Sequence, residues 1–353
     1  MVSRVISIDG PSASGKSSVA AGVATALGFP NVSTGSMYRA VALVAMRRGL
    51  NAGNVSGSKL EPVLAELELG YVDSADGFKL CVNGEFPDAE LRTEEVAAFT
   101  SVIAALPELR EWMRDRQRKL AGRGWLVMEG RDIGTEIFPD AAMKFFLTAT
   151  AEERARRRLA QGEGGGSSLE EIAQAIAERD YKDSTRKISP LKAAADARII
   201  DSTGNTFEET VGAILSMIRH HDTLYRVSYG DTDQMGVVYY ANYLELFERG
   251  RTEMLRSVGL SYRELEEMGV FLPVSKVGVN YLASAHYDDL LTIRTQVVSA
   301  KGARLLIASE ILAGEKILVR GEVTLGCVDG ERKLRRLPQE LVDACAVYRR
   351  EGE

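Results

Sequence analysis

The stretch that decides the fold of the first half of the chain is Gly10-Pro11-Ser12-Ala13-Ser14-Gly15-Lys16-Ser17. A short apolar run, Val5–Asp9, precedes it, and a helical pattern, Lys16–Leu27, follows it and stops at Gly28. This is the phosphate-loop pattern in the context that it requires, between a strand and a helix. The glycines let the backbone amides close around an anion at the start of the helix. The segment therefore predicts an α/β unit that binds a nucleoside triphosphate.

Each part of this loop has an expected role with ATP. Lys16 adds positive charge at the phosphates that are transferred, and the hydroxyl of Ser17 is expected to bind the cofactor Mg²⁺. The expected ATP contacts of the loop come from Gly10, Pro11, Ser12, Ala13, Ser14, Gly15, Lys16, Ser17 and Ser18. The alternative is a glycine-rich turn without a nucleotide, which the flanking strand and helix disfavour.

Length and composition restrict the class of protein. A chain of 353 residues exceeds the usual size of one domain and predicts two. No apolar run is long enough to span a bilayer, and the three cysteines are too scattered for a disulfide framework or a zinc site. We therefore expect a cytoplasmic protein without a membrane partner. The net charge of −6 argues against a nucleic-acid polymer as a partner.

Further strands are expected along the first half. The apolar runs at 125–128, 143–147 and 198–201 alternate with helical stretches. This alternation favours a parallel sheet with helices on both faces.

Two segments depart from that alternation. Residues 60–106 contain short strand-like pieces and the turn signals Asp76-Gly77 and Asn83-Gly84, which indicate an inserted lobe. A glycine-rich run between two charged helices predicts a mobile lid over residues 154–168.

The pattern changes near residue 220. Beyond it, apolar and polar residues alternate at 291–297 and 319–325, as in strands with one solvated face. Helical spacing runs from Tyr243 to Val258, and Gly259 is a plausible stop. We expect an α+β domain with one long helix against a curved sheet. The predicted division is a first domain at 1–219, a linker at 220–224 and a second domain at 225–350.

Arginines occur at several separate places in the first half, namely Arg39, Arg92, Arg110, Arg131, Arg179 and Arg186. Any one of them alone is best explained as a surface ion pair. Together they suit a site for two phosphate groups, since a guanidinium grips phosphate oxygens in pairs. The Asn-Lys-x-Asp signature of guanine-nucleotide binding is absent from the sequence. A kinase is therefore favoured over a GTPase.

Residues 5–218 resemble the bacterial cytidylate kinase family. Besides the phosphate loop, the resemblance rests on four motifs: Thr34-Gly35-Ser36-Met37-Tyr38-Arg39, Leu91-Arg92-Thr93-Glu94-Glu95-Val96, Gly130-Arg131-Asp132-Ile133-Gly134-Thr135, and Arg179-Asp180 through Arg186 to Leu191. It implies a nucleoside-monophosphate kinase fold whose inserted lobe binds CMP. The implied activity is the phosphorylation of CMP and dCMP by ATP.

The resemblance also implies roles for single residues. Thr34, Arg39, Arg131 and Arg186 would hold the CMP phosphate, Ser101, Arg110 and Asp132 would read the cytosine, and Arg179 and Asp183 would contact the ribose and phosphate side. Lys16, Arg131, Asp132 and Arg186 are the expected catalytic residues of this domain. One departure is Glu129, where the family usually has aspartate. The carboxylate is kept with one extra methylene, so we expect activity to be retained.

An arginine run, Arg154 with Arg156 to Arg158, lies on the helix that enters the predicted lid. One or two of these side chains could neutralise charge on the transferring phosphoryl group, and Arg154 and Arg158 are chosen as ATP-binding residues. The alternative is a solvated helix face.

The stretch from Tyr229 to Tyr243 resembles the 4-hydroxybenzoyl-CoA thioesterase and related acyl-CoA thioesterase families, which have a hot-dog fold. The resemblance implies that Asp233 is the catalytic carboxylate, as nucleophile or as general base. Val238, Tyr239 and Tyr240 would lead into a helix start whose amides polarise the thioester carbonyl. It further implies an acyl-CoA substrate and a homo-oligomer formed through this domain. Many relatives have histidine in place of Tyr240.

Three alternatives stay open. Asp231 and Asp233 could be a turn or helix-capping pair. The second domain could be a non-catalytic module for oligomerisation or CoA binding. The first could belong with other small-molecule kinases, such as adenylate or shikimate kinases, although the inserted lobe with Ser101 and Arg110 argues against this.

Overall fold

The computed structural model describes residues 2–74, 77–160, 168–186 and 188–350. The predicted turn at Asp76 and the glycine-rich part of the predicted lid, residues 161–167, lie outside the described residues. The chain divides into two compact units, one of residues 3–214 and one of Val2 with residues 215–350.

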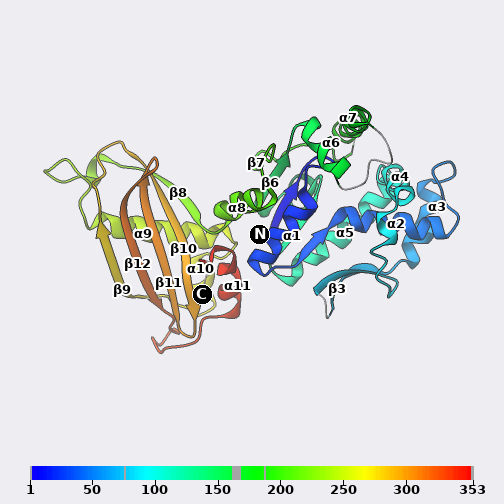
Figure 1. The fold of residues 1–353 in the computed structure, drawn as a ribbon. Helices are drawn as coiled ribbons and strands as arrows, with labels where there is room; N and C mark the ends of the chain where they lie inside the picture. Colours follow the sequence, from blue (N-terminus) through cyan, green and yellow to red (C-terminus); the bar gives the residue numbers. More distant parts are fainter. Residues whose placement is uncertain (1, 75–76, 161–167, 187, 351–353) are drawn as a thin grey trace. The chain divides into compact units, whose positions relative to one another are not determined.

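The first unit is built on a five-stranded parallel sheet with the order β2-β5-β1-β6-β7 (Figure 1). Its strands are β1 (Ser3–Asp9), β2 (Asn31–Ser33), β5 (Leu126–Gly130), β6 (Ala141–Thr148) and β7 (Arg198–Asp201). The predicted parallel sheet is confirmed. Strand β1 lies at its centre, and the phosphate loop leaves its carboxyl end.

Helices follow most of these strands. They are α1 (Lys16–Leu27), α2 (Thr34–Arg47), α3 (Gly57–Glu66), α4 (Glu94–Ile103), α5 (Pro107–Leu120), α6 (Ala151–Ala160), α7 (Leu169–Thr185) and α8 (Phe207–Ile218), with short turns η1 (Glu90–Arg92), η2 (Ala121–Arg123) and η3 (Ile133–Ile137). Helix α1 has the predicted bounds because Gly15 and Gly28, with φ of 87° and 69°, cap its ends. Helix α2 begins at Thr34 because the Ser33 side chain caps it by accepting a hydrogen bond from the amide of Ser36.

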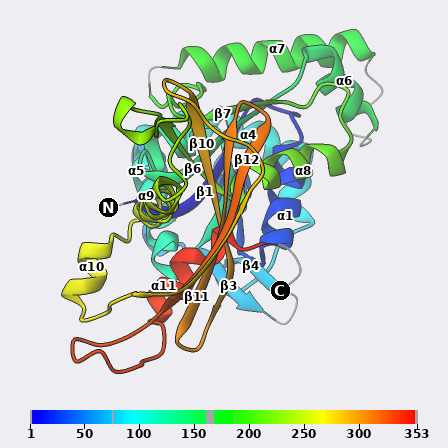
Figure 2. The ribbon, with the colours of Figure 1, turned by 90° about the vertical axis from the view of Figure 1, so that its left-hand side faces the viewer.

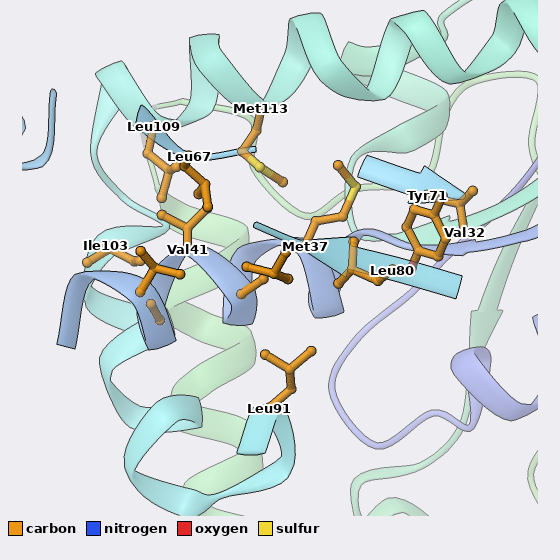
Figure 3. Packing of buried hydrophobic residues seen from close by; sticks show 14 of the residues in the cluster. Val32, Met37, Val41, Leu67, Tyr71, Leu80, Leu91, Ile103, Leu109 and Met113 are labelled. Carbon is orange, nitrogen blue, oxygen red and sulfur yellow. The ribbon is translucent and has the colours of Figure 1, made fainter. Parts of the chain in front are cut away.

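The stretch predicted as an inserted lobe contains α4, most of α3 and an antiparallel hairpin of β3 (Leu69–Ser74) and β4 (Gly77–Val82). Its apolar side chains share one core with α2 and α5. Figure 3 shows Met37 and Val41 of α2 among Leu80, Leu91 and Met113. The lobe is therefore anchored to the helix that follows β2.

The second unit has a five-stranded antiparallel sheet with the order β8-β10-β11-β12-β9. Its elements are β8 (His221–Arg226), η4 (Tyr229–Asp231), α9 (Asn242–Ser257), α10 (Tyr262–Glu267), β9 (Val274–Tyr281), β10 (Leu290–Lys301), β11 (Arg304–Ala313), β12 (Lys316–Gly326), α11 (Gln339–Cys345) and η5 (Ala346–Tyr348). Strands β10, β11 and β12 run side by side as long twisted strands (Figure 2). The expected α+β arrangement of one long helix and a curved sheet is confirmed.

The predicted linker at 220–224 is where the structure differs from expectation. The division between the two units falls within α8, and β8 begins at His221, where exposed and partly buried residues alternate and pair with β10. A strand of six residues with a polar sequence gives a weak periodic signal, so it was not recognised. Among the described residues, no helix combines the length and apolar character needed to cross a membrane.

Helix α9 packs closely on its sheet because two glycines leave room. A Cβ atom on Gly321 would lie 2.3 Å from the ring of Phe247, and one on Gly250 would lie 2.5 Å from the Thr295 hydroxyl. Phe247 is almost fully buried. Neither glycine can therefore be enlarged without moving the helix.

We expect Gly321→Ala to lower the free energy of unfolding of the second unit by about 1–3 kcal/mol, because the new methyl group overlaps a buried ring that cannot move away. Calorimetric unfolding measures this change. Gly278→Ala is the matched control, since a Cβ atom there meets nothing within 4 Å. Equal stability of the two variants would contradict the packing described.

Candidate active sites

The phosphate loop is held in shape by backbone geometry and close packing. Ala13 and Gly15 have positive φ values of 59° and 87°. A Cβ atom on Gly10 would lie 2.2 Å from the carbonyl oxygen of Leu147, so only glycine allows this approach. The Lys16 ammonium group folds back and donates to the carbonyl of Pro11 at 3.0 Å. The loop is thus formed without a nucleotide.

Lys16 lies in surroundings that disfavour its charge. Burial, followed by the nearby Arg131 guanidinium, lowers the pKa of Lys16 to about 8, although Glu129 opposes the shift. A site with this excess of positive charge fits a ligand that carries several negative charges. The polyphosphate of a nucleotide is such a ligand.

Two arginines of α6 contact the loop. Arg154 pairs with Asp180 of α7 and donates to the carbonyl of Ser12 at 3.2 Å. Arg157 donates to the carbonyl of Ser14 at 3.2 Å and to that of Ser202 at 2.6 Å. Arg154 was chosen from the predicted arginine run as an ATP-binding residue, whereas Arg157 of the same run was not. Their spacing of three nevertheless places them on one helix face. The predicted Arg158 lies near Arg179.

Oxygen atoms suited to Mg²⁺ meet beside the loop. The Ser17 hydroxyl donates to Glu129 Oε1 at 3.0 Å, and the Ser33 hydroxyl donates to the same oxygen. In the described ranges no three His, Cys, Asp or Glu side chains group as a metal site. Mg²⁺ commonly takes one or two protein oxygens and completes its shell with phosphates and water. Ser17 and Glu129 fit that mode.

A second cluster, called the acceptor cluster here, consists of Arg110, Arg131, Asp132, Asp183 and Arg186. Arg110 and Asp132 form a buried ion pair. Asp183 Oδ2 lies 3.0 Å from Arg131 Nε, and its Oδ1 lies 3.8 Å from Arg186 Nη1. Arg131 also donates to the carbonyl of Gly10 at 3.2 Å. The acceptor cluster therefore adjoins the phosphate loop.

The acceptor cluster has more donors than partners. Arg110 Nε and Arg186 Nη2 are buried and find no hydrogen-bond acceptor in the described part of the chain. Burial, and then the Arg110 charge, lowers the pKa of Arg186, and burial with Arg131 lowers the pKa of Arg179 to about 10. Buried polar groups are normally satisfied, so these two atoms suit a ligand that offers hydrogen-bond acceptors.

Of the other predicted residues, Thr34 contacts the strand that leads to the acceptor cluster, whereas Ser101 makes no contact with the cluster in the described residues. The buried Thr34 hydroxyl donates to the carbonyl of Glu129 at 2.9 Å. Arg39 donates to the carbonyl of Leu91 at 3.3 Å, where the inserted lobe meets α2. Ser101 is exposed on α4, and its hydroxyl donates to Ala97 of the same helix at 3.3 Å.

Two residues of this site, Asp9 and Asp180, had no predicted role. Asp9 closes β1, and its carboxylate accepts from the amides of Ile133 and Gly134. The position of Asp9 immediately before the loop was the only available signal. Asp180 accepts from the amide of Ser12 at 3.4 Å besides pairing with Arg154.

In the second unit, Asp233 lies in a tight turn. Its Oδ1 accepts from the amide of Met235 at 2.8 Å, and its own amide donates to the carbonyl of Val237 at 2.9 Å. Oδ1 therefore stabilises the turn, which is the role that the sequence offered as the alternative to catalysis. Oδ2 accepts no hydrogen bond in the described residues, and the side chain is partly exposed. This oxygen can meet a ligand.

Some backbone amides near the start of α9 already donate hydrogen bonds within the protein. Those of Val238 and Tyr239 donate at 2.9 Å to the carbonyls of Ala285 and Asp231, so they do not fit the expected role toward a thioester. Within the described chain, the amides of Tyr240 and Ala241 donate to no acceptor. Both lie in the turn just before α9, so they are candidate donors to a ligand there.

Comparisons with known proteins divide the chain into two parts as well. The family model of cytidylate kinase matches residues 6–220, and that of the thioesterase-like superfamily matches residues 227–345. A cytidylate kinase from Citrifermentans bemidjiense is 39% identical over 64% of this chain and 95% of its own length. One from Shouchella clausii is 44% identical over 61% of this chain and 96% of its own length.

Among solved structures, a probable thioesterase from Bartonella henselae is 42% identical and covers 34% of this chain and 99% of its own, with a TM-score of 0.33. The two family models divide the chain near the same place as its two sheets. By the phosphate loop, the acceptor cluster and the match over residues 6–220, the chain belongs to the cytidylate kinase family, with a thioesterase-like hot-dog domain following the kinase.

Proposed function

We propose that the first unit transfers the γ-phosphoryl group of Mg·ATP to CMP and dCMP. The observation that carries the proposal is the pair of buried, unsatisfied guanidinium nitrogens, Arg110 Nε and Arg186 Nη2, beside the phosphate loop. A nucleoside monophosphate would supply acceptors for both: phosphate oxygens for Arg186, and the ring nitrogen and carbonyl of the base for Arg110.

The arrangement supports transfer by positioning and charge neutralisation. Lys16, and Arg154 and Arg157 of α6, contact the phosphate loop, and Arg131 lies between the loop and Asp183. Ser17 and Glu129 would hold Mg²⁺, which would offset the negative charge of the ATP phosphates. Such transfer needs little covalent help from the protein.

Asp132 and Arg110 suit the recognition of cytosine. A carboxylate accepts from the exocyclic amine at C4, and a guanidinium donates to the ring nitrogen and carbonyl. Uracil has a carbonyl at C4, which a carboxylate repels. A buried, oriented pair at 6–7% exposure discriminates between such groups better than a solvated one.

We expect Asp132→Asn to lower the preference for CMP over UMP by about tenfold or more, because asparagine can donate to a carbonyl. The measurement is kcat/KM for CMP, dCMP, UMP and AMP with ATP and Mg²⁺. Asp140→Asn, at an exposed contact with Ser3, is the control. A wild-type preference for AMP would overturn the assignment of the phosphoryl acceptor.

The lowered pKa of Lys16 predicts how ATP binding depends on pH. In the free protein, the Lys16 ammonium loses its proton as the pH rises through about 8. Binding of an ATP analogue should therefore weaken above that pH, by up to about tenfold per pH unit. Titration calorimetry from pH 7 to 9 measures this. Lys16→Met should show weak binding without the same dependence; an unchanged slope would exclude Lys16 as its origin.

We infer further that the second unit hydrolyses an acyl-CoA. Asp233 Oδ2 would attack the thioester carbonyl, or would take a proton from the attacking water. The free amides of Tyr240 and Ala241 would stabilise the oxyanion at the start of α9. The CoA thiolate leaves as the carbon–sulfur bond breaks. If Asp233 is the nucleophile, water then hydrolyses the anhydride that it forms with the acyl group and frees the carboxylate.

A second candidate is a non-catalytic module that binds CoA or oligomerises the kinase. The edge strand β9 favours oligomerisation, because Val274, Val277 and Tyr281 are 40–48% exposed on it. An exposed apolar edge suits pairing with a second copy of the chain. We propose a homo-oligomer under both candidates.

Two substitutions should separate the activities. Asp233→Asn should abolish acyl-CoA hydrolysis, by roughly 10²-fold or more, and leave CMP phosphorylation unchanged. Lys16→Ala should do the reverse, because it removes charge from the phosphate loop alone. Initial rates with a panel of acyl-CoA thioesters and with CMP measure both. If the wild type cleaves no thioester in the panel, the non-catalytic module is the better candidate.

A further inference from the structure

The carboxylate of Asp9 joins two parts of the kinase site that are far apart in the sequence. Asp9 is the last residue of β1, directly before Gly10. Its Oδ1 accepts from the amide of Ile133 at 2.9 Å, and its Oδ2 accepts from that of Gly134 at 2.8 Å. Both amides open η3, the turn that follows Arg131 and Asp132. The strand carrying the phosphate loop therefore also holds the acceptor cluster.

A second contact makes the same connection. Arg131 Nη1 donates to the carbonyl of Gly10 at 3.2 Å, while its Nε lies 3.0 Å from Asp183 Oδ2. Asp132 is paired with Arg110. Two bonds from Asp9 and one from Arg131 thus fix the residues that would grip CMP against those that would grip ATP.

Holding a turn with a buried carboxylate costs free energy, because the charged group is removed from water. Asp9 is 5% exposed, and burial raises its pKa to about 7 even though both amides oppose the shift. A backbone carbonyl or a hydroxyl could satisfy an amide without this cost. A carboxylate offers two oxygens at a fixed spacing and stronger bonds, which fix a turn more firmly.

Asp9 does not suit proton transfer. Each oxygen already accepts a backbone amide, and the side chain has almost no contact with solvent. A general base would need a free oxygen within reach of the attacking group.

We propose that Asp9 is a positioning residue for phosphoryl transfer, fixing the turn at Arg131 and Asp132 so that the two bound nucleotides are aligned for reaction. This inference rests on the CMP-binding role proposed for the acceptor cluster. Small displacements of reacting groups lower rates far more than they lower affinity, so the effect belongs on kcat.

The test is Asp9→Asn, which keeps one acceptor oxygen and sets an amino group against the second amide. We expect kcat with CMP to fall by roughly 10- to 100-fold, while dissociation constants of an ATP analogue and of CMP, measured by calorimetry, change by less than about threefold. Thr210→Val is the control, because it removes a buried hydroxyl of α8 outside the site. It should change the melting temperature and leave kcat unchanged.

A double-substitution cycle makes the test specific. If Asp9 acts through Arg131, the fold-loss of kcat caused by Asp9→Asn should be smaller in the Arg131→Met background than in the wild-type background. The two fold-losses should differ by a factor of about ten or more. The positioning role would be refuted if the effects of Asp9→Asn and Arg131→Met on kcat were additive in free energy. It would also be refuted if Asp9→Asn alone kept kcat within about twofold of wild type. Asp9→Ser, which also keeps one acceptor, replaces Asp9→Asn if the latter is insoluble. A wild type inactive on CMP would instead refute the proposed function.

Discussion

The kinase unit depends on positive charge that is gathered beside the phosphate loop. Burial lowers the pKa of Lys16, Arg179 and Arg186, and nearby guanidinium groups add to the shift: that of Arg131 for Lys16 and Arg179, and that of Arg110 for Arg186. The acidic residues nearby, Asp132, Asp180 and Asp183, each pair with an arginine. Anionic nucleotides therefore enter a site where the cations are already oriented. This preorganisation costs stability in the free protein and reduces the reorganisation needed during transfer.

The sheet explains how distant segments reach this site. Parallel strands deliver the loops at their carboxyl ends to one edge, and β1, at the centre of the sheet, pairs with both β5 and β6. The phosphate loop follows β1, and Arg131 follows β5. The inserted lobe reaches the same edge through α2, whose first residue is Thr34, because both share one apolar core. Topology thus brings the phosphate loop, Thr34 and Arg131, which come from three separate parts of the chain, to one edge of the sheet.

The sequence predicted the sheet, α1 and the phosphate loop well, because each has a strong local signal: an apolar run, glycines at both helix ends, or a fixed motif. The distributed arginines predicted a site for two phosphate groups, but the role of each residue came only from family resemblance, since lone arginines have no local signature. Arg157 was not chosen from its run, and Asp9 had no predicted role, because their contacts with Ser14 and with the amides of Ile133 and Gly134 are tertiary. The linker prediction at 220–224 differed from the structure, in which β8 gains its order by pairing with β10 along the sheet. Val238 and Tyr239 were chosen by position, which could not reveal that their amides are already bonded.

Glu129 shows how a departure from the usual aspartate can be accommodated. Its longer side chain places one carboxylate oxygen within hydrogen-bond reach of both Ser17, at the proposed metal site, and Ser33, the cap of α2. The Tyr71 hydroxyl of β3 in turn bonds both the amide and the carbonyl of Ser33. A continuous set of hydrogen bonds therefore runs from the phosphate loop to the inserted lobe. A shorter carboxylate at position 129 would have to give up one serine or move its strand, and β5 is buried along its whole length. The extra methylene is thus matched to the spacing of the two serines, and the substitution preserves the connection between the two halves of the site.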